Sequence, residues 1–249
     1  MSRYILEGCV DSLASALNAF QGGANRLELC ANLVIGGTTP SPALLDQVSS
    51  QVSIPIRVLI RPRFGDFLYN TEEVHQMEAE IRSLIPFGAS GFVIGALTED
   101  GSLDLDTLKR LIDAADGRPI TLHRAFDMCR DPFQALEDAC ALGIDTILTS
   151  GQQDSCLTGL PLIRQLNEQA RDRIRIMCGA GVSATVIQTI LEEAPLSAFH
   201  MSGKHVVESH MRYRNPSVHM GLKEISEYEL WRANEETFAL VKKILEENL

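Results

Sequence analysis

The stretch RLELC, residues 26–30, follows a double glycine and has the pattern of a β-strand. Its two leucines alternate with Arg26, Glu28 and Cys30, so the apolar and polar side chains point to opposite faces of the strand. A carboxyl group and a thiol two residues apart on one face belong either to an ordinary solvated surface or to a site. The rest of the chain decides between these two interpretations.

Seven further β-rich runs occur along the chain, at intervals of roughly 30 residues, with helix signals between them. Ser41-Pro42 and Asp131-Pro132, for example, are typical first residues of helices. Eight strands that alternate with helices predict an α/β fold, a single TIM-type (β/α)8 barrel of parallel strands. A doubly wound open sheet is the alternative, but the first turn, GCVDS, lacks the glycine pattern of that fold. The predicted strands are residues 4–8, 26–30, 56–61, 91–96, 120–124, 146–150, 174–179 and 198–202.

Composition limits the classes of partner. The 249 residues show no linker, so we expect one domain over residues 1–249; 45% are hydrophobic and 22% charged, as in ordinary globular proteins. The net charge of -11 makes nucleic acid an unfavourable partner, since phosphate backbones would be repelled. No run approaches the ~20 apolar residues of a membrane span, so we expect no membrane partner. The first residues lack a secretion signal, which favours reduced thiols in the cytosol.

Two of the six cysteines occupy equivalent positions on neighbouring predicted strands. The first strand ends Glu7-Gly8-Cys9 and the second Glu28-Leu29-Cys30. Paired parallel strands lie ~4.8 Å apart, so the two sulfurs can approach each other if both face the barrel interior. A thiolate pair favours copper(I) and other soft ions; the alternative is inert buried packing. No Cys-x-x-Cys spacing occurs, which disfavours a zinc knuckle.

Other strand ends carry candidates for catalysis, because barrel chemistry is located where strands end and loops begin. Arg61 can pair with Glu28 inside the barrel, or hold a carboxylate or phosphate from a ligand. His123, near Asp127, is a candidate acid or base. His200 is also predicted to point inwards. The candidate catalytic residues are Glu28, Arg61, His123 and Asp127.

Two small-residue segments resemble anion cradles. CGAGVSA, residues 178–184, leads from a strand into a helix, and HMSGK, residues 200–204, ends the last strand. Free backbone N–H groups at such places bind phosphate, although glycines also simply make tight turns. The long stretch 203–221 predicts a lid, an interface segment or a disordered loop. The predicted anion-binding residues are Gly179, Gly181, Ser202 and Gly203.

Eight motifs in order resemble the CutC family of copper-homeostasis proteins, and its animal members more than its enterobacterial ones. They are LEGCVDS, GGANRLELC, GGTTPS, IRPRFGDF, GALTEDG, HRAFDM, LTSG and MRYRN. The resemblance implies a TIM-type barrel in the cytoplasm, and in the nucleus for animal members, that forms homodimers, tetramers or other homo-oligomers. It also implies that copper(I) is bound by the cysteines that correspond here to Cys9 and Cys30.

The resemblance does not supply an enzymatic activity, and two functions therefore stay open. The first is a copper(I)-binding protein of copper homeostasis. The second is a barrel enzyme that acts on a small anionic or phosphorylated metabolite. The chain has no lysine in any predicted strand, which disfavours a Schiff-base aldolase among such enzymes.

Overall fold

The β-rich runs form one closed barrel whose apolar outer face is covered by helices. In the computed structural model, which describes residues 3–220 and 225–249, eight parallel strands pair in sequence order and β8 closes on β1. The predicted (β/α)8 barrel is therefore confirmed, and the open sheet is wrong. The strands are β1 (Ile5–Val10), β2 (Arg26–Leu29), β3 (Ile56–Leu59), β4 (Gly91–Ile94), β5 (Ile120–Leu122), β6 (Thr146–Thr149), β7 (Arg175–Cys178) and β8 (Ala198–Met201).

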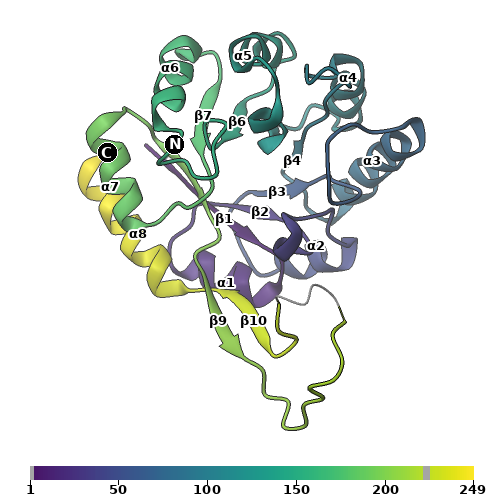
Figure 1. Cartoon of the computed structure of the whole chain (residues 1–249), viewed down its shortest axis with the longest axis vertical. Helices are drawn as coiled ribbons and strands as arrows, with labels where there is room; N and C mark the ends of the chain where they lie inside the picture. The colour runs from purple at the N-terminus through teal and green to yellow at the C-terminus, as the bar shows by residue number, and fades with distance from the viewer. Residues whose placement is uncertain (1–2, 221–224) are drawn as a thin grey trace.

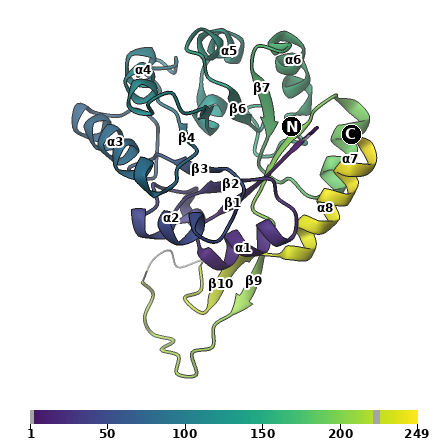
Figure 2. The ribbon, with the colours of Figure 1, turned by 180° about the vertical axis from the view of Figure 1, so that it is seen from behind.

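Side-chain caps determine where several of the surrounding helices begin. Asn70 and Glu73 form a capping box at the start of α3, Asp131 accepts two backbone N–H groups at the start of α5, and Ser183 caps α7. Figures 1 and 2 show the helices as a ring around the barrel. No helix in the described part of the chain has the length and apolarity needed to cross a membrane. The helices are α1 (Leu13–Gln21), α2 (Pro42–Ser49), α3 (Thr71–Leu84), α4 (Leu105–Ala114), α5 (Pro132–Ala141), α6 (Leu160–Ala170), α7 (Ala184–Glu193) and α8 (Glu235–Asn248), with 3-10 turns η1 (Leu33–Ile35), η2 (Ile85–Phe87) and η3 (Arg124–Met128).

The polar face of the RLELC strand points into the barrel. Leu27 and Leu29 are fully buried in the large apolar core, whereas Arg26 pairs with Glu7 of β1. The Arg26 Nη2 group also contacts the sulfur of Met177 on β7 at 3.2 Å, which requires the side chain to extend through the barrel interior. The strand alternation is thus confirmed, and its polar residues are buried rather than solvated.

Between β8 and α8 the chain leaves the barrel as an antiparallel hairpin made of β9 (Lys204–Glu208) and β10 (Glu229–Ala233). Figures 1 and 2 show this hairpin, with residues 209–220 that follow β9, projecting beyond α1. The hairpin starts within the stretch for which the sequence predicts a lid, an interface segment or a disordered loop. Several large apolar side chains between the two strands, including Met211, Tyr213 and Met220, are exposed.

Candidate functional site

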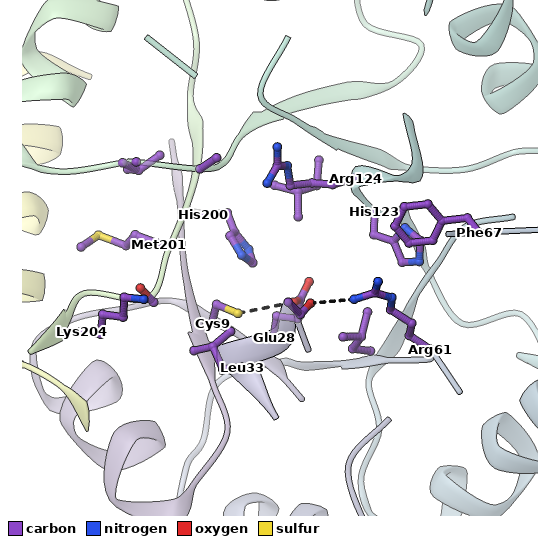
Figure 3. A pocket seen from close by; sticks show the side chains of 17 residues that line it. Cys9, Glu28, Leu33, Arg61, Phe67, His123, Arg124, His200, Met201 and Lys204 are labelled. Carbon is purple, nitrogen blue, oxygen red and sulfur yellow. Dashed lines mark hydrogen bonds between the residues drawn. The ribbon is translucent and has the colours of Figure 1, made fainter. Parts of the chain in front are cut away.

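A cavity of about 440 Å³ opens where the barrel strands end. Volumes of roughly 300–1,000 Å³ are typical of small-molecule sites. Figure 3 shows that side chains from opposite sides of the barrel point into it. Among the residues that line it are Cys9, Glu28, Arg61, His123, Gly181, His200 and Ser202.

One side of the cavity carries soft and titratable groups, and we call Cys9, Glu28 and His200 the cysteine wall. The Cys9 thiol donates a hydrogen bond to Glu28 Oε1 at 3.5 Å (Figure 3). One ligand atom from each of the three residues lies within 4.8 Å of the others, the only such group of three in the described residues. Cys30 is fully buried beside Cys9 in a small apolar cluster with Leu59, outside this group. Its thiol faces the Val10 carbonyl oxygen at 3.5 Å.

Beneath the cysteine wall lies a buried network of charges. The Glu7 carboxylate, fully buried, accepts from Arg26 Nε and lies 2.8 Å from His200 Nδ1. Burial works to raise the pKa of Glu7, but Arg26 and His200 outweigh it and lower that pKa to about 2. Burial likewise works to lower the pKa of His200, yet Glu28 and Cys9 raise it well above the ordinary 6.5. The raised pKa favours the imidazolium form of His200, which donates Nδ1–H to Glu7.

The thiol and carboxyl groups of the cysteine wall are harder to ionise than usual. Interaction with the Cys30 thiol, followed by burial, raises the pKa of Cys9 well above 9.0. Burial also raises the pKa of Glu28, and its Oε2 atom has no hydrogen-bond partner in the described residues. The two carboxylates of the repeated Glu-x-Cys pattern thus differ: Glu7 is ionised and paired, whereas Glu28 retains a free oxygen.

His123 lies across the barrel from Cys9, at the end of β5. The Ala125 backbone N–H donates to its Nδ1 at 3.1 Å, so Nε2 carries the ring proton. Burial, reinforced by the charge of Arg61, lowers the pKa of His123 to about 3 and keeps the ring neutral. Nε2 is buried and unpartnered within the described chain. A Cβ on Gly95 would lie 2.4 Å from the ring, so only glycine leaves it room.

Arg61 is fixed by loop carbonyls and not by Glu28. Nη1 donates to the carbonyl oxygens of Gly36 at 3.3 Å and Gly37 at 3.1 Å, and Nη2 donates to that of Gly65 at 2.8 Å. Its Nε has no partner among the residues described. The expected ion pair between Arg61 and Glu28 does not occur in the described part of the chain. Carbonyl oxygens of the loops after β2 and β3 bind the guanidinium instead.

Asp127 is an anchor for the loop after β6. Its carboxylate accepts from the Thr149 hydroxyl, from the Ser150 N–H and hydroxyl, and from the Gln152 N–H. Arg124 completes the arrangement at 2.7 Å. Asp127 does not line the cavity, whereas Arg124 does. Asp127, one of the candidate catalytic residues, therefore holds an arginine that reaches the cavity.

The loop after β7 has free backbone donors. Gly179 N–H donates to the Thr149 carbonyl at 3.0 Å, and Gly179 does not line the cavity. Ala180, Gly181 and Val182 do line it, and none of their N–H groups has a recorded acceptor in the described residues. Ala180 and Gly181 both have positive φ, 69° and 75°, so the chain turns sharply at this point before helix α7 begins.

The turn after β8 brings fewer of the predicted backbone groups to the cavity, and it adds a charged side chain that was not predicted. Ser202 lines the cavity, but Gly203, with φ of 51°, packs against Phe238 and does not. Lys204 lines it, with its ammonium 3.4 Å from the centre of the Trp231 ring. Neither Lys204 nor Arg124 has a role predicted from the sequence, although Lys204 ends the segment HMSGK and Arg124 directly follows His123.

Comparisons with known proteins agree on one family. The family model described as CutC family matches residues 4–205. A mouse protein named copper homeostasis protein cutC homolog is 49% identical over 228 residues, 91% of this chain and 84% of its own length. The human protein of that name is 48% identical over the same shares. A CutC family protein from Pasteurella multocida is 44% identical over 97% of this chain and 98% of its own.

Solved structures extend the agreement to three dimensions. The crystal structure of a putative copper homeostasis protein CutC from Streptococcus agalactiae has a TM-score of 0.76 and 32% identity, covering 80% of this chain and 98% of that one. A structure titled QR15, an aldolase, has a TM-score of 0.62 at 15% identity, covering 80% of this chain and 90% of that one. The second likeness shows the barrel fold alone.

Proposed function

The chain belongs to the CutC family, and on this premise we propose that it binds copper(I) through Cys9 and Cys30 as part of copper homeostasis. The observation that supports this most is the pair of reduced thiols at the end of the barrel. Cys9 faces the cavity, and Cys30 lies beside it in the same small cluster. Two sulfur ligands suit a soft ion of low coordination number, whereas structural zinc usually takes four ligands.

The remaining groups of the cysteine wall fit this ion less well than the two sulfurs. His200 is held as a cation by Glu7 and Glu28, so it must lose a proton before it can bind metal. The Glu28 carboxyl offers oxygen, which harder ions prefer. Because the pKa of Cys9 is raised, copper must displace a proton from the thiol, and binding weakens as pH falls. The thiol pair is therefore the proposed ligand set.

An anaerobic copper(I) titration against a competing chelator tests this proposal. We expect one ion per chain for the wild type and at least a tenfold weaker affinity for Cys9→Ser and Cys30→Ser. Cys140→Ser is the matched control, because Cys140 lies on helix α5, outside the barrel, and is partly exposed. If both cysteine variants keep the stoichiometry and affinity of the wild type, the pair is ordinary barrel packing.

A second function, binding or conversion of a small anionic metabolite, is favoured by the size and charge of the cavity. At about 440 Å³ it is far larger than one metal ion requires. Arg124, Lys204 and His200 bring positive charge to it, and it is also lined by residues 180–182, whose amides have no acceptor in the described chain. Inorganic phosphate added to the protein should shift the amide NMR signals of residues 180–182. If those signals do not move at millimolar phosphate, this second function loses its support.

A further inference from the structure

Two buried hydrogen-bond donors on the side of the cavity away from Cys9 lack partners. They are His123 Nε2–H and Arg61 Nε–H, on side chains that are 5% and 8% exposed. A buried polar group without a partner is destabilising, so proteins rarely keep one without a reason. Both residues line the cavity, and Figure 3 shows them side by side around Phe67. Two unpartnered donors thus lie on residues at the cavity wall.

The surroundings fix both groups as donors. The bond from Ala125 N–H to Nδ1 forces the proton of His123 onto Nε2. The carbonyl oxygens of Gly37 and Gly65 hold both ends of the Arg61 fork, so its Nε cannot turn away. The Phe67 ring lies 4.9 Å from the His123 ring and 5.0 Å from the Arg61 guanidinium carbon, and it packs the pair together. A partner for two fixed donors has to be an acceptor oxygen.

Other residues that line the cavity supply a second set of donors. The free amides of Ala180, Gly181 and Val182 lie at the loop that leads into helix α7, and Arg124 and Lys204 line the same cavity. Successive free amides and cations of this kind bind phosphate groups. The two sets face one cavity of about 440 Å³, which leaves room for a small organic molecule between them.

We propose that His123 and Arg61 form a subsite for the carboxylate or carbonyl oxygen of a small phosphorylated compound whose phosphate lies at residues 180–182. This inference rests on the second function proposed above and names its ligand class. His123 acts here as a neutral hydrogen-bond donor and not as a base, since its outward nitrogen already carries the proton. Arg61 supplies the positive charge that the neutral ring does not.

The test compares three probes on the wild type by histidine side-chain NMR and by calorimetry: 2-phosphoglycolate, inorganic phosphate and glycolate. We expect the Nε2–H signal of His123 to shift with phosphoglycolate and not with phosphate. Phosphoglycolate should also bind at least tenfold more tightly than phosphate, because it reaches both sets of donors. Equal affinity for phosphoglycolate and phosphate, with an unmoved His123 signal, overturns the proposal and leaves water as the partner of the two donors.

Two substitutions of His123 distinguish the effect of its N–H donor from the effect of its size and shape. His123→Leu should remove the advantage of phosphoglycolate over phosphate and leave phosphate binding unchanged, whereas His123→Gln, which retains an N–H donor, should keep part of that advantage. His75→Leu is the matched control, since His75 is exposed on helix α3. Unchanged phosphoglycolate affinity in His123→Leu contradicts the proposal. Failure of phosphate itself to bind removes the proposed anion cavity instead, and a shift of His123 with glycolate would then preserve the subsite alone.

Discussion

His200 and His123 lie at the carboxyl ends of two barrel strands and line one cavity, yet they carry different charges. His200 Nδ1 lies 2.8 Å from the Glu7 carboxylate, and its pKa is raised. His123 Nδ1 accepts from a backbone amide near Arg61, and its pKa falls to about 3. Both residues are histidines near the carboxyl end of a barrel strand, so the neighbouring groups decide which ring favours the imidazolium form. One cavity thereby gains a cationic and a neutral histidine on opposite sides.

The two histidines lie on parts of the cavity for which different ligands are proposed. The cysteine wall, with His200 supported by Glu7, gathers sulfur and carboxyl groups that suit a metal ion. The side with His123 and Arg61 offers unpartnered donors that suit an acceptor oxygen. The predictions that follow test whether this division depends on the contacts described, from the largest expected effect to the smallest.

The largest effect should come from breaking the charge network beneath His200. Arg26→Met leaves the fully buried Glu7 carboxylate without its arginine, and removing one partner of a buried pair costs about 3–5 kcal/mol. Urea unfolding at neutral pH measures this loss of unfolding free energy. Arg173→Met is the matched control, because its pair with Glu137 is well exposed and should change stability little. Equal losses in the two variants would show that the buried network does not stabilise the barrel.

The second effect concerns pH and distinguishes the two rings. The pKa of His123 falls from 6.5 to about 3 on folding. Its contribution to the free energy of unfolding is therefore complete above pH 6.5 and is lost as pH falls. The slope is about 1.4 kcal/mol per pH unit, or about 3 kcal/mol between pH 6.5 and 4.5. His200 has the opposite sign: its contribution is complete below pH 6.5 and is lost as pH rises through the elevated pKa.

Unfolding free energies measured from pH 4.5 to 8.5 check both signs. In His123→Leu the loss of stability below pH 6.5 should become shallower. In His200→Gln the loss above pH 6.5 should become shallower instead. If the two variants have the same pH profile as the wild type, the histidines do not differ in charge as described.

The smallest effect should come from the packing that holds the neutral side together. Phe67→Leu removes the ring that contacts both His123 and Arg61 but retains an apolar side chain of similar bulk. We expect a loss of about 0.5–1.5 kcal/mol in unfolding free energy, since ring and cation contacts of this kind contribute that much. Copper(I) affinity should stay unchanged. A copper affinity that falls with this substitution would mean that the two sides are coupled.

The sequence predicted the barrel because eight β-rich runs alternate with helical segments, several of which begin at a clear capping residue. The same alternation placed Glu28 and Cys30 on the face opposite the leucines, which the structure confirms as the barrel interior. Bonds made by loop backbone could not be predicted in this way. The hydrogen bonds from Arg61 to the carbonyl oxygens of Gly36 and Gly37 depend on the backbone path of the turn after β2. No pattern of side chains in the sequence predicts that path.

Contacts that form only when the barrel closes could not be predicted from the sequence either. Glu7 meets His200 because β8 pairs with β1, and strand periodicity alone gives no register between strands 193 residues apart. Asp127 looked like a partner for His123 because it is near in sequence. The 3-10 turn η3 instead directs its carboxylate towards the backbone of residues 150 and 152.

The division of the cavity between the two histidines is tested most directly by following both ring signals by NMR during an anaerobic copper(I) titration of the wild type. Binding at Cys9 and Cys30 should shift the signals of His200, whose ring lies with Cys9 and Glu28 in one cluster, and leave those of His123 in place. The shift should saturate at one ion per chain. Signals of His123 that move with copper while those of His200 do not would contradict the account.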